Sequence, residues 1–266
     1  MTIRVAYVAF ETAGEPTLVV AGKLRLPAQA DVGGPGPGVV ICHGSDGVDG
    51  RGEFYAPALN AAGIATLEID MWAARGAARG AAARPRSPIQ TLPDAFAARA
   101  FLARQPEIDG RRIGILGFSW GGVVTLLSAR RANVASLDGG QGFAAHAANY
   151  PVCWAYAAVP ALRLNDLTGA PILIQTGEAD AYDAPGAGPA LGASLRAGGA
   201  TDVECKAYPG ATHGFDRDLP PQTINDPFAH QGAGGPVLMT FDRVAASAAR
   251  VAAVEFFQRT LMPLQK

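Results

Sequence analysis

The stretch RIGILGFSWGG at residues 112–122 decides the fold of this chain. Its apolar run 113–116 predicts a short strand buried on both faces of a parallel sheet. The run leads into a G-x-S-x-G pattern with Ser119 at its centre, and a helix is expected from about Gly121. In such a turn, glycines two before and two after the serine remove side chains that would collide with the neighbouring strand and helix. The pattern predicts Ser119 as a nucleophile at a helix N-terminus.

Strand-like and helix-like runs alternate on both sides of this stretch, which predicts a mostly parallel sheet of about eight strands with helices on both faces. No long linker or internal repeat interrupts the alternation, so we expect residues 1–266 to form one domain. The other expected elements are an antiparallel hairpin of strands 4–11 and 18–26, strands 39–42, 65–69, 143–150, 172–175 and 203–208, helices through 54–62, 92–105 and 190–197, and loops 33–38, 72–88 and 216–239.

A final helix is expected near the C-terminus, where apolar residues recur at steps of three and four. We expect them to form one apolar face that lies on the sheet. They are Phe241, Val244, Ala248, Val251, Val254, Phe257 and Leu261.

Composition excludes several classes of protein. The 266 residues are 49% hydrophobic and 17% charged, which is typical of a globular chain, and a net charge of −1 provides no positive field for nucleic acid. No apolar run reaches the length of a membrane span, and the opening residues do not resemble a signal peptide, so we expect a cytoplasmic protein. Cys42, Cys153 and Cys205 lack the spacing of a disulfide framework or zinc site, and we expect neither metal nor cofactor.

A serine nucleophile needs a histidine base and a carboxylate that orients it, in the chain order Ser, acid, His. Asp180 follows the expected strand 172–175 and lies where open α/β sheets build their sites, so it is the candidate acid. Asp183 is an alternative, and Glu178 follows the strand too closely to be preferred.

His213 is the candidate base among the four histidines. It follows the last expected strand within YPGATHGFD, and a turn there returns it to the sheet edge that carries Ser119 and Asp180. His146 falls inside a strand and His230 in a Pro/Gly-rich loop. His43, which follows the strand 39–42, is interpreted as shaping its own loop rather than as a second base.

Acyl transfer also needs two hydrogen-bond donors for the oxyanion. The backbone N–H of Trp120, the residue after the nucleophile, is the first. The second is expected from the loop HGSDG at 43–47, with Ser45 N–H preferred and either neighbour as an alternative.

With these motifs the chain resembles the dienelactone hydrolase family of the α/β-hydrolases. The similar stretches are HGSDGV, YAPALNAAGIATLEID, RIGILGFSWGG, YPVC, PILIQTGEADAYDAP, YPGATHGFD and the closing helix that ends in EFF. Dienelactone hydrolases proper carry cysteine where this chain has Ser119, and the acidic partner of that cysteine corresponds to Gly44. The resemblance therefore implies an α/β-hydrolase fold and a serine branch of carboxylic ester hydrolases.

Only 18 positions separate Cys153 from Pro171, too few for the helical cap of many α/β-hydrolases, so we expect an open cleft. Trp72, Trp120 and Phe215 are candidate apolar walls.

The stretch 72–88 carries four arginines and no acidic residue: Arg75, Arg79, Arg84 and Arg86. One interpretation is a solvated loop. The other is that Arg75, in a stretch similar to one where the family has an arginine near its site, binds a substrate carboxylate.

These residues predict a serine hydrolase of small carboxylic esters or lactones. Amide or peptide cleavage and acyl transfer to an alcohol would use the same residues, so the sequence leaves them open. A ligand receptor that keeps the fold without catalysis is the alternative from another class. The expected partner is a small-molecule substrate, and the oligomeric state is not predicted.

Overall fold

The strand that ends directly before Ser119 lies in the middle of an eight-stranded sheet. The computed structural model describes residues 2–27, 34–77 and 84–262. The strands of the sheet are β1 (Ile3–Glu11), β2 (Val19–Pro27), β3 (Gly36–Cys42), β4 (Ala65–Asp70), β5 (Ile108–Phe118), β6 (Ala145–Asn149), β7 (Ile172–Gly177) and β8 (Val203–Tyr208). Their order is β1-β2-β4-β3-β5-β6-β7-β8, with β1, β2 and β4 paired antiparallel and the remaining pairs parallel. This confirms the predicted sheet, including its leading hairpin.

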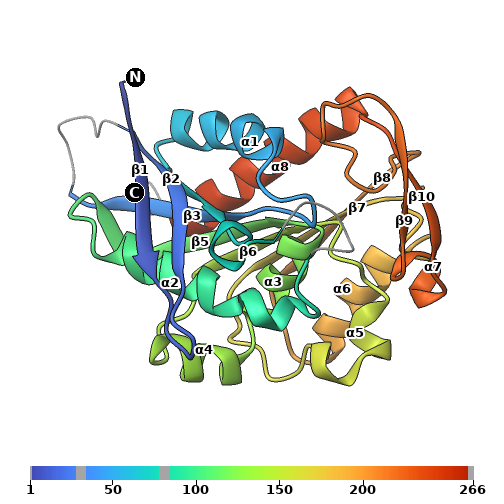
Figure 1. Cartoon of the computed structure of the whole chain (residues 1–266), viewed down its shortest axis with the longest axis horizontal. Helices are drawn as coiled ribbons and strands as arrows, with labels where there is room; N and C mark the ends of the chain where they lie inside the picture. Colours follow the sequence, from blue (N-terminus) through green and yellow to red (C-terminus); the bar gives the residue numbers. More distant parts are fainter. Residues whose placement is uncertain (1, 28–33, 78–83, 263–266) are drawn as a thin grey trace.

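Helices cover both faces of the sheet, and most of them follow a strand. They are α1 (Gly50–Ala61), α2 (Leu92–Ala103), α3 (Trp120–Leu127), α4 (Arg131–Asp138), α5 (Ala155–Ala158), α6 (Ala187–Ala197), α7 (Ala229–Gly232) and α8 (Arg243–Leu261), with 3-10 turns η1 (Ala73–Arg75), η2 (Pro88–Thr91) and η3 (Pro160–Leu162). Figure 1 shows α1 and α8 together on one face, and α2, α3 and α6 on the other. Among the described residues, no large cap covers the sheet, as predicted.

Local chemistry sets where the helices begin. The Asp49 side chain accepts a hydrogen bond from the backbone N–H of Arg51, so α1 starts four residues before the predicted helix. Asp242 caps α8 in the same way through the N–H groups of Val244 and Ala245.

The face by which α8 packs on the sheet differs from the predicted one. Val244 is 80% exposed and Val251 is 52% exposed, although both belong to the predicted apolar face. Phe257 and Leu261 of the predicted face are buried as expected, and the rest of the buried face is formed by Ala245, Ala246, Ala249, Ala252, Ala253 and Phe256. Alanine lets the helix approach the strands, and a Cβ on Gly114 would stand 2.6 Å from the Phe257 ring. Close packing rather than valine spacing decides the orientation of the helix.

The segment 216–239, expected as a loop, contains a second small sheet. β9 (Gln222–Asp226) and β10 (Gly235–Met239) pair antiparallel and are joined through α7. His230 and Gln231 in this connection have backbone φ angles of 50° and 58°, values that residues other than glycine rarely adopt. The connection is much longer than a two-residue turn, so the sequence carries no hairpin signal. Figure 1 shows this hairpin at the end of the sheet near α6.

Glu68 on β4 makes the stability of the fold depend on pH. Glu68 is 5% exposed. Its carboxylate packs closely against Gly52 of α1, where an added Cβ would lie 1.9 Å from Oε1 of Glu68. Burial raises the pKa of this carboxyl from 4.5 to about 7, against the opposing effect of Arg25.

We expect the folded protein to lose stability relative to a Glu68→Gln variant as pH rises from about 4.5 to 7. A group whose folded pKa is raised contributes stability that is complete below its unfolded pKa and is lost as pH rises through the folded pKa. Between pH 5 and pH 8 the difference amounts to about 2–3 kcal/mol in the free energy of unfolding. Urea unfolding of both proteins at these two pH values measures it. Parallel changes in the two proteins would contradict the prediction.

Candidate active site

Ser119 stands on a strained turn between β5 and α3. Its φ of 52° and ψ of −111° lie in a region that non-glycine residues rarely occupy. A Cβ on Gly117 would lie 2.0 Å from the carbonyl oxygen of Gly121, and a Cβ on Gly121 would lie 2.2 Å from that of Cys42. The two glycines of the pattern are therefore required by backbone packing, which explains their spacing around the serine.

Ser119, His213 and Asp180 form a continuous chain of hydrogen bonds. The Oγ of Ser119 lies 2.8 Å from Nε2 of His213, and Nδ1 of His213 lies 2.7 Å from Oδ2 of Asp180. The side chains of His213 and Asp180 are only 5% and 1% exposed. An imidazole whose Nδ1–H faces a carboxylate presents the lone pair of Nε2 to the serine hydroxyl. This arrangement can remove a proton from Ser119.

Asp180 is fixed from its other side as well. Its Oδ1 accepts a hydrogen bond of 2.9 Å from the backbone N–H of Tyr182, whose ring lies 4.2 Å from the His213 ring. The sequence analysis did not single out Tyr182, although its position two residues after the acid is a usable signal.

Asp183, the alternative acid, has another task. Its two oxygens accept hydrogen bonds of 2.8 and 2.7 Å from the backbone N–H groups of Cys153 and Trp154. Asp183 therefore holds the segment after β6. The structure brings Asp180, and not Asp183, to Nδ1 of the histidine, while Glu178 is exposed.

A buried cluster anchors the loop that carries His213. Asp216, three residues further on, is 2% exposed and accepts hydrogen bonds from the hydroxyls of Tyr55 and Tyr150. The Tyr150 ring also packs edge-on against His213, with ring centres 4.8 Å apart. The partners come from distant segments, so the sequence analysis could not find this cluster.

Both ring nitrogens of His43 are within hydrogen-bond distance of backbone groups. Nδ1 lies 2.7 Å from the carbonyl oxygen of Gly44, and Nε2 accepts a hydrogen bond of 2.9 Å from the N–H of Met71. Burial lowers the pKa of His43 to about 4, so the ring is neutral near pH 7. These contacts agree with its interpretation as a residue that shapes the loop.

The two remaining histidines lie elsewhere. His146 is buried in β6, and burial lowers its pKa to about 4. His230 lies on α7, with its Nε2 2.9 Å from the carbonyl oxygen of Pro236.

The candidate oxyanion donors lie on two turns beside Ser119. Trp120 begins α3, where the first backbone N–H groups of a helix have no partner within the helix. Ser45 lies in the tight turn closed by the Gly47 N–H and the Gly44 carbonyl oxygen at 3.1 Å. Ser45 and Ser119 border the same cavities, so this turn faces the nucleophile.

The predictions that place Trp72 and Phe215 against the substrate are wrong. Trp72 is 3% exposed and donates from Nε1 to the carbonyl oxygen of Ser45 at 3.0 Å, so it supports the turn from behind. Phe215 is fully buried between the rings of Tyr150 and Tyr208. Neither residue lines the cavities at Ser119, because both rings are buried against other residues of the protein interior.

The interpretation of Arg75 as a substrate anchor is also wrong, because its guanidinium already donates hydrogen bonds to groups of the protein. It forms two hydrogen bonds of 2.6 and 3.0 Å to the carboxylate of Asp94 and also donates to the carbonyl oxygens of Met71 and Gln90. Asp94 is fully buried, so this pair is structural. Arg75 does not line the cavities at Ser119. Arg79, another arginine of the stretch 72–88, lies outside the described residues.

We expect Arg75→Ala to destabilise the protein by about 3–5 kcal/mol, because it leaves the buried Asp94 carboxylate without its partner. The double variant Arg75→Ala/Asp94→Ala should recover part of this loss in the free energy of unfolding. The ratio of kcat/KM for a neutral ester to that for its ω-carboxylate analogue should stay as in the wild type. A ratio that shifts by tenfold would restore Arg75 as a substrate anchor.

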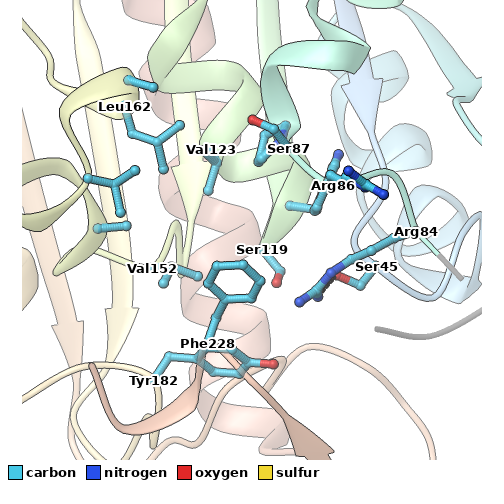
Figure 2. A pocket seen from close by; sticks show the side chains of 15 residues that line it. Ser45, Arg84, Arg86, Ser87, Ser119, Val123, Val152, Leu162, Tyr182 and Phe228 are labelled. Carbon is cyan, nitrogen blue, oxygen red and sulfur yellow. Dashed lines mark hydrogen bonds between the residues drawn. The ribbon is translucent and has the colours of Figure 1, made fainter. Parts of the chain in front are cut away.

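Two cavities meet at Ser119. The larger, of about 230 Å³, is shown in Figure 2. It is lined by Ser45, Arg84, Arg86, Ser87, Pro88, Ser119, Trp120, Val123, Val152, Ala155, Val159, Ala161, Leu162, Tyr182 and Phe228. The smaller, of about 30 Å³, is lined by Gly44, Ser45, Asp46, Arg51, Ser119, Tyr182, His213, Gly214, Arg217, Ile224, Asp226 and Met239. Of the predicted wall residues, Trp120 lines the larger cavity.

Comparison with known families decides the assignment. The family model described as the dienelactone hydrolase family matches residues 20–261. The chain belongs to the dienelactone hydrolase family. It is thereby a carboxylic ester hydrolase, and it acts on small molecules as this family does. No curated protein sequence is significantly similar to it.

Solved structures share the fold of this dienelactone hydrolase family member. A dienelactone hydrolase-like promiscuous phosphotriesterase, P91 from metagenomic libraries, is 21% identical, with 98% of this chain and 99% of that chain covered and a TM-score of 0.69. Esterase 2 of Thermogutta terrifontis, phosphorylated by paraoxon, is 14% identical over 97% and 96%, with a TM-score of 0.70. A dienelactone hydrolase from Anabaena variabilis ATCC 29413 is 19% identical over 98% and 100%, with a TM-score of 0.62.

Gly44, which the resemblance matches with the family's acidic residue, is closely packed against Arg51. A Cβ on Gly44 would lie 2.8 Å from Nη2 of Arg51 and 3.3 Å from the carbonyl oxygen of Phe118, so a side chain here would require Arg51 to shift. Arg51 is itself held in place, because Nη2 donates to the Asp49 carboxylate at 2.8 Å and Nη1 to the Tyr150 hydroxyl at 3.1 Å. Within the described part of the chain, no group of three or more His, Cys, Asp or Glu residues is arranged to hold a metal ion. No helix in residues 2–27, 34–77 and 84–262 is long and apolar enough to cross a membrane.

Proposed function

We propose that this protein is a serine hydrolase that cleaves small carboxylic esters or lactones through an acyl-enzyme on Ser119. The observation that carries the proposal is the hydrogen-bonded chain from Ser119 through His213 to Asp180. A serine hydroxyl is a weak nucleophile by itself, and a histidine held by a buried carboxylate is the usual means of activating it.

The reaction proceeds in two halves. Nε2 of His213 accepts the hydroxyl proton as Ser119 Oγ forms a bond to the ester carbonyl carbon, and the resulting oxyanion accepts hydrogen bonds from the N–H groups of Trp120 and Ser45. The tetrahedral intermediate then expels the alcohol, to which the His213 imidazolium returns the proton. Water, deprotonated by His213, then attacks the carbonyl carbon of the acyl-enzyme. As this second intermediate collapses, the bond to Oγ breaks, the His213 imidazolium returns the proton to Ser119 Oγ, and the carboxylic acid leaves. Asp180 orients the ring and stabilises its charge throughout.

These steps account for every proton and electron pair with side chains and water, so the proposal includes no cofactor or metal ion. We retain the expectations of a single cytoplasmic domain and of a small-molecule substrate. Amide cleavage and acyl transfer to an alcohol use the same steps with another leaving group or acceptor. A substrate panel separates them from ester hydrolysis.

Covalent labelling tests the nucleophile directly. The Thermogutta esterase in the comparison was phosphorylated by paraoxon, which makes a phosphylating probe a natural choice. We expect a fluorophosphonate to label wild-type protein once, on Ser119 by peptide mapping, and an ester substrate to protect it. Protein that hydrolyses esters without labelling at Ser119 would overturn the serine mechanism. Absence of both labelling and ester turnover would favour a ligand receptor instead.

A further inference from the structure

The two cavities at Ser119 differ in whether they reach the general acid. His213 lines the smaller cavity and not the larger one. If Ser119 and His213 act as proposed above, the imidazolium must deliver its proton to the departing oxygen, which therefore lies on the His213 side. The alcohol portion of the ester belongs in the smaller cavity, and the acyl portion in the larger one.

The wall of the larger cavity is mostly apolar. Val123, Val152 and Leu162 face its interior in Figure 2, and Phe228 and Tyr182 close it on the side of the β9–β10 hairpin. An acyl chain that enters this space exchanges water for hydrocarbon side chains and aromatic rings.

Arg84, one of the two arginines that line this cavity, is paired with a buried carboxylate. Arg84 donates hydrogen bonds to the carboxylate of Asp226 and to the hydroxyl of Ser45, at distances of 3.0 and 2.7 Å. Its guanidinium also lies 5.5 and 5.2 Å from the ring centres of Trp120 and Phe228. The Arg84 side chain is 8% exposed and that of Asp226 is 1% exposed. A substrate carboxylate would have to compete with Asp226 for this group, so the inner wall favours an uncharged acyl chain.

Size separates the two cavities further. The larger has a volume of about 230 Å³, more than the ~150 Å³ of an apolar cavity that binds benzene. The smaller measures about 30 Å³ and is bordered by the charged groups of Asp46, Arg51, Arg217 and Asp226. It admits only a small alcohol.

We infer that the preferred substrates are esters of medium-sized, uncharged, apolar carboxylic acids with small alcohols, and that the cavity lined by Val123, Val152 and Leu162 binds the acyl group. This inference rests on the proposed function, because it needs Ser119 and His213 in their catalytic roles. It replaces the carboxylate preference that Arg75 suggested.

A pair of isomeric esters tests the orientation. Ethyl hexanoate and hexyl acetate have the same composition and similar intrinsic reactivity, but the six-carbon unit is the acyl group in the first ester and the alcohol portion in the second. Each buried methylene contributes about 0.8 kcal/mol, or about a fourfold change in kcat/KM, so we expect ethyl hexanoate to exceed hexyl acetate by at least about 30-fold. Equal rates, or faster cleavage of hexyl acetate, would overturn the assignment.

Ethyl hydrogen adipate, which carries a carboxylate at the far end of a six-carbon acyl chain, tests the charge preference. We expect a kcat/KM at least about tenfold below that of ethyl hexanoate. A faster reaction of the adipate would show that Arg86, exposed at the rim of the cavity, or Arg84 recruits the anion, and would overturn the preference for uncharged acyl chains.

A substitution in the wall identifies the cavity. Ala161 lines it and is exposed at its outer side, so Ala161→Trp narrows the cavity without overpacking the core. Ala157→Trp is the matched control, because Ala157 is exposed on α5 and does not line the cavity. We expect Ala161→Trp to lower kcat/KM for ethyl hexanoate at least tenfold and for ethyl acetate less than twofold, and Ala157→Trp to change neither.

The outcomes separate this inference from the proposed function. If Ala161→Trp lowers kcat/KM equally for ethyl hexanoate and ethyl acetate, the assignment of the acyl cavity is overturned. Fluorophosphonate labelling of Ser119 in the same protein would still support the serine mechanism. Failure of the wild type to cleave any ester, together with failure of labelling, would overturn the proposed function itself and the inference with it.

Discussion

Ser119→Ala should lower kcat for p-nitrophenyl esters by about 10⁶, to the level of residual catalysis by oxyanion binding alone. The hydroxyl oxygen forms the covalent bond of the acyl-enzyme, and no neighbouring group replaces it. The structural cost is small, because within residues 2–27, 34–77 and 84–262 the Ser119 hydroxyl forms a single hydrogen bond, which it donates to Nε2 of His213. Thermal unfolding should therefore occur within a few degrees of the wild type.

Steady-state kinetics and titration with a fluorophosphonate check this prediction together. The titration counts active sites, so contamination by wild-type protein is measured rather than assumed. Ser136→Ala is a suitable control, since Ser136 is exposed on α4 and lines neither cavity at Ser119. A Ser119→Ala enzyme that keeps more than a small fraction of wild-type kcat, without any labelled sites, would contradict the nucleophile assignment.

Asp180→Asn should lower kcat by about 10⁴. The amide no longer favours the tautomer in which Nδ1 of His213 carries the proton, and it withdraws the negative charge that stabilises the imidazolium. Asparagine keeps the shape of the side chain, and its oxygen can still accept the hydrogen bond from the Tyr182 N–H. The measurement is kcat under saturating ester, with circular dichroism to show that the fold is retained.

Asp183→Asn is the matched control for this substitution. Asp183 accepts two backbone hydrogen bonds, from Cys153 and Trp154, and an amide can accept only one of them with its oxygen. We expect a loss of about 1–3 kcal/mol in the free energy of unfolding and less than a tenfold change in kcat. If Asp183→Asn instead showed the larger loss in kcat and Asp180→Asn the smaller, Asp183 would be the acid.

Features that depend on neighbours in the chain were predicted from the sequence. The G-x-S-x-G turn is one, because the glycine requirement comes from backbone atoms within a few residues of Ser119 and from the adjacent strand. The location of Asp180 and His213 beside Ser119 follows from a general rule, since residues after the C-terminal ends of parallel strands share one edge of the sheet. The predicted parallel sheet and its hairpin follow from short-range hydrophobic patterns in the same way.

Features that depend on partners far along the chain were decided only by the tertiary structure. Arg75 and Arg84 belong to one arginine-rich stretch, yet Arg75 pairs with Asp94, and Arg84 reaches the larger cavity because Asp226, 142 positions away, holds it there. Phe215 is two residues from His213, and no local pattern indicates that its ring packs between two tyrosines.

In α8, the sequence predicts the helix, but the tertiary structure decides which face packs on the sheet. Its helical period is present in the sequence, but the sheet accepts the alanine face, because small side chains permit the close approach that brings Phe257 against Gly114. The sequence alone determined the fold class and the three residues proposed for catalysis, because short-range patterns encode both. The walls of the substrate cavities were decided by the tertiary structure, because they are built from side chains whose positions depend on long-range packing.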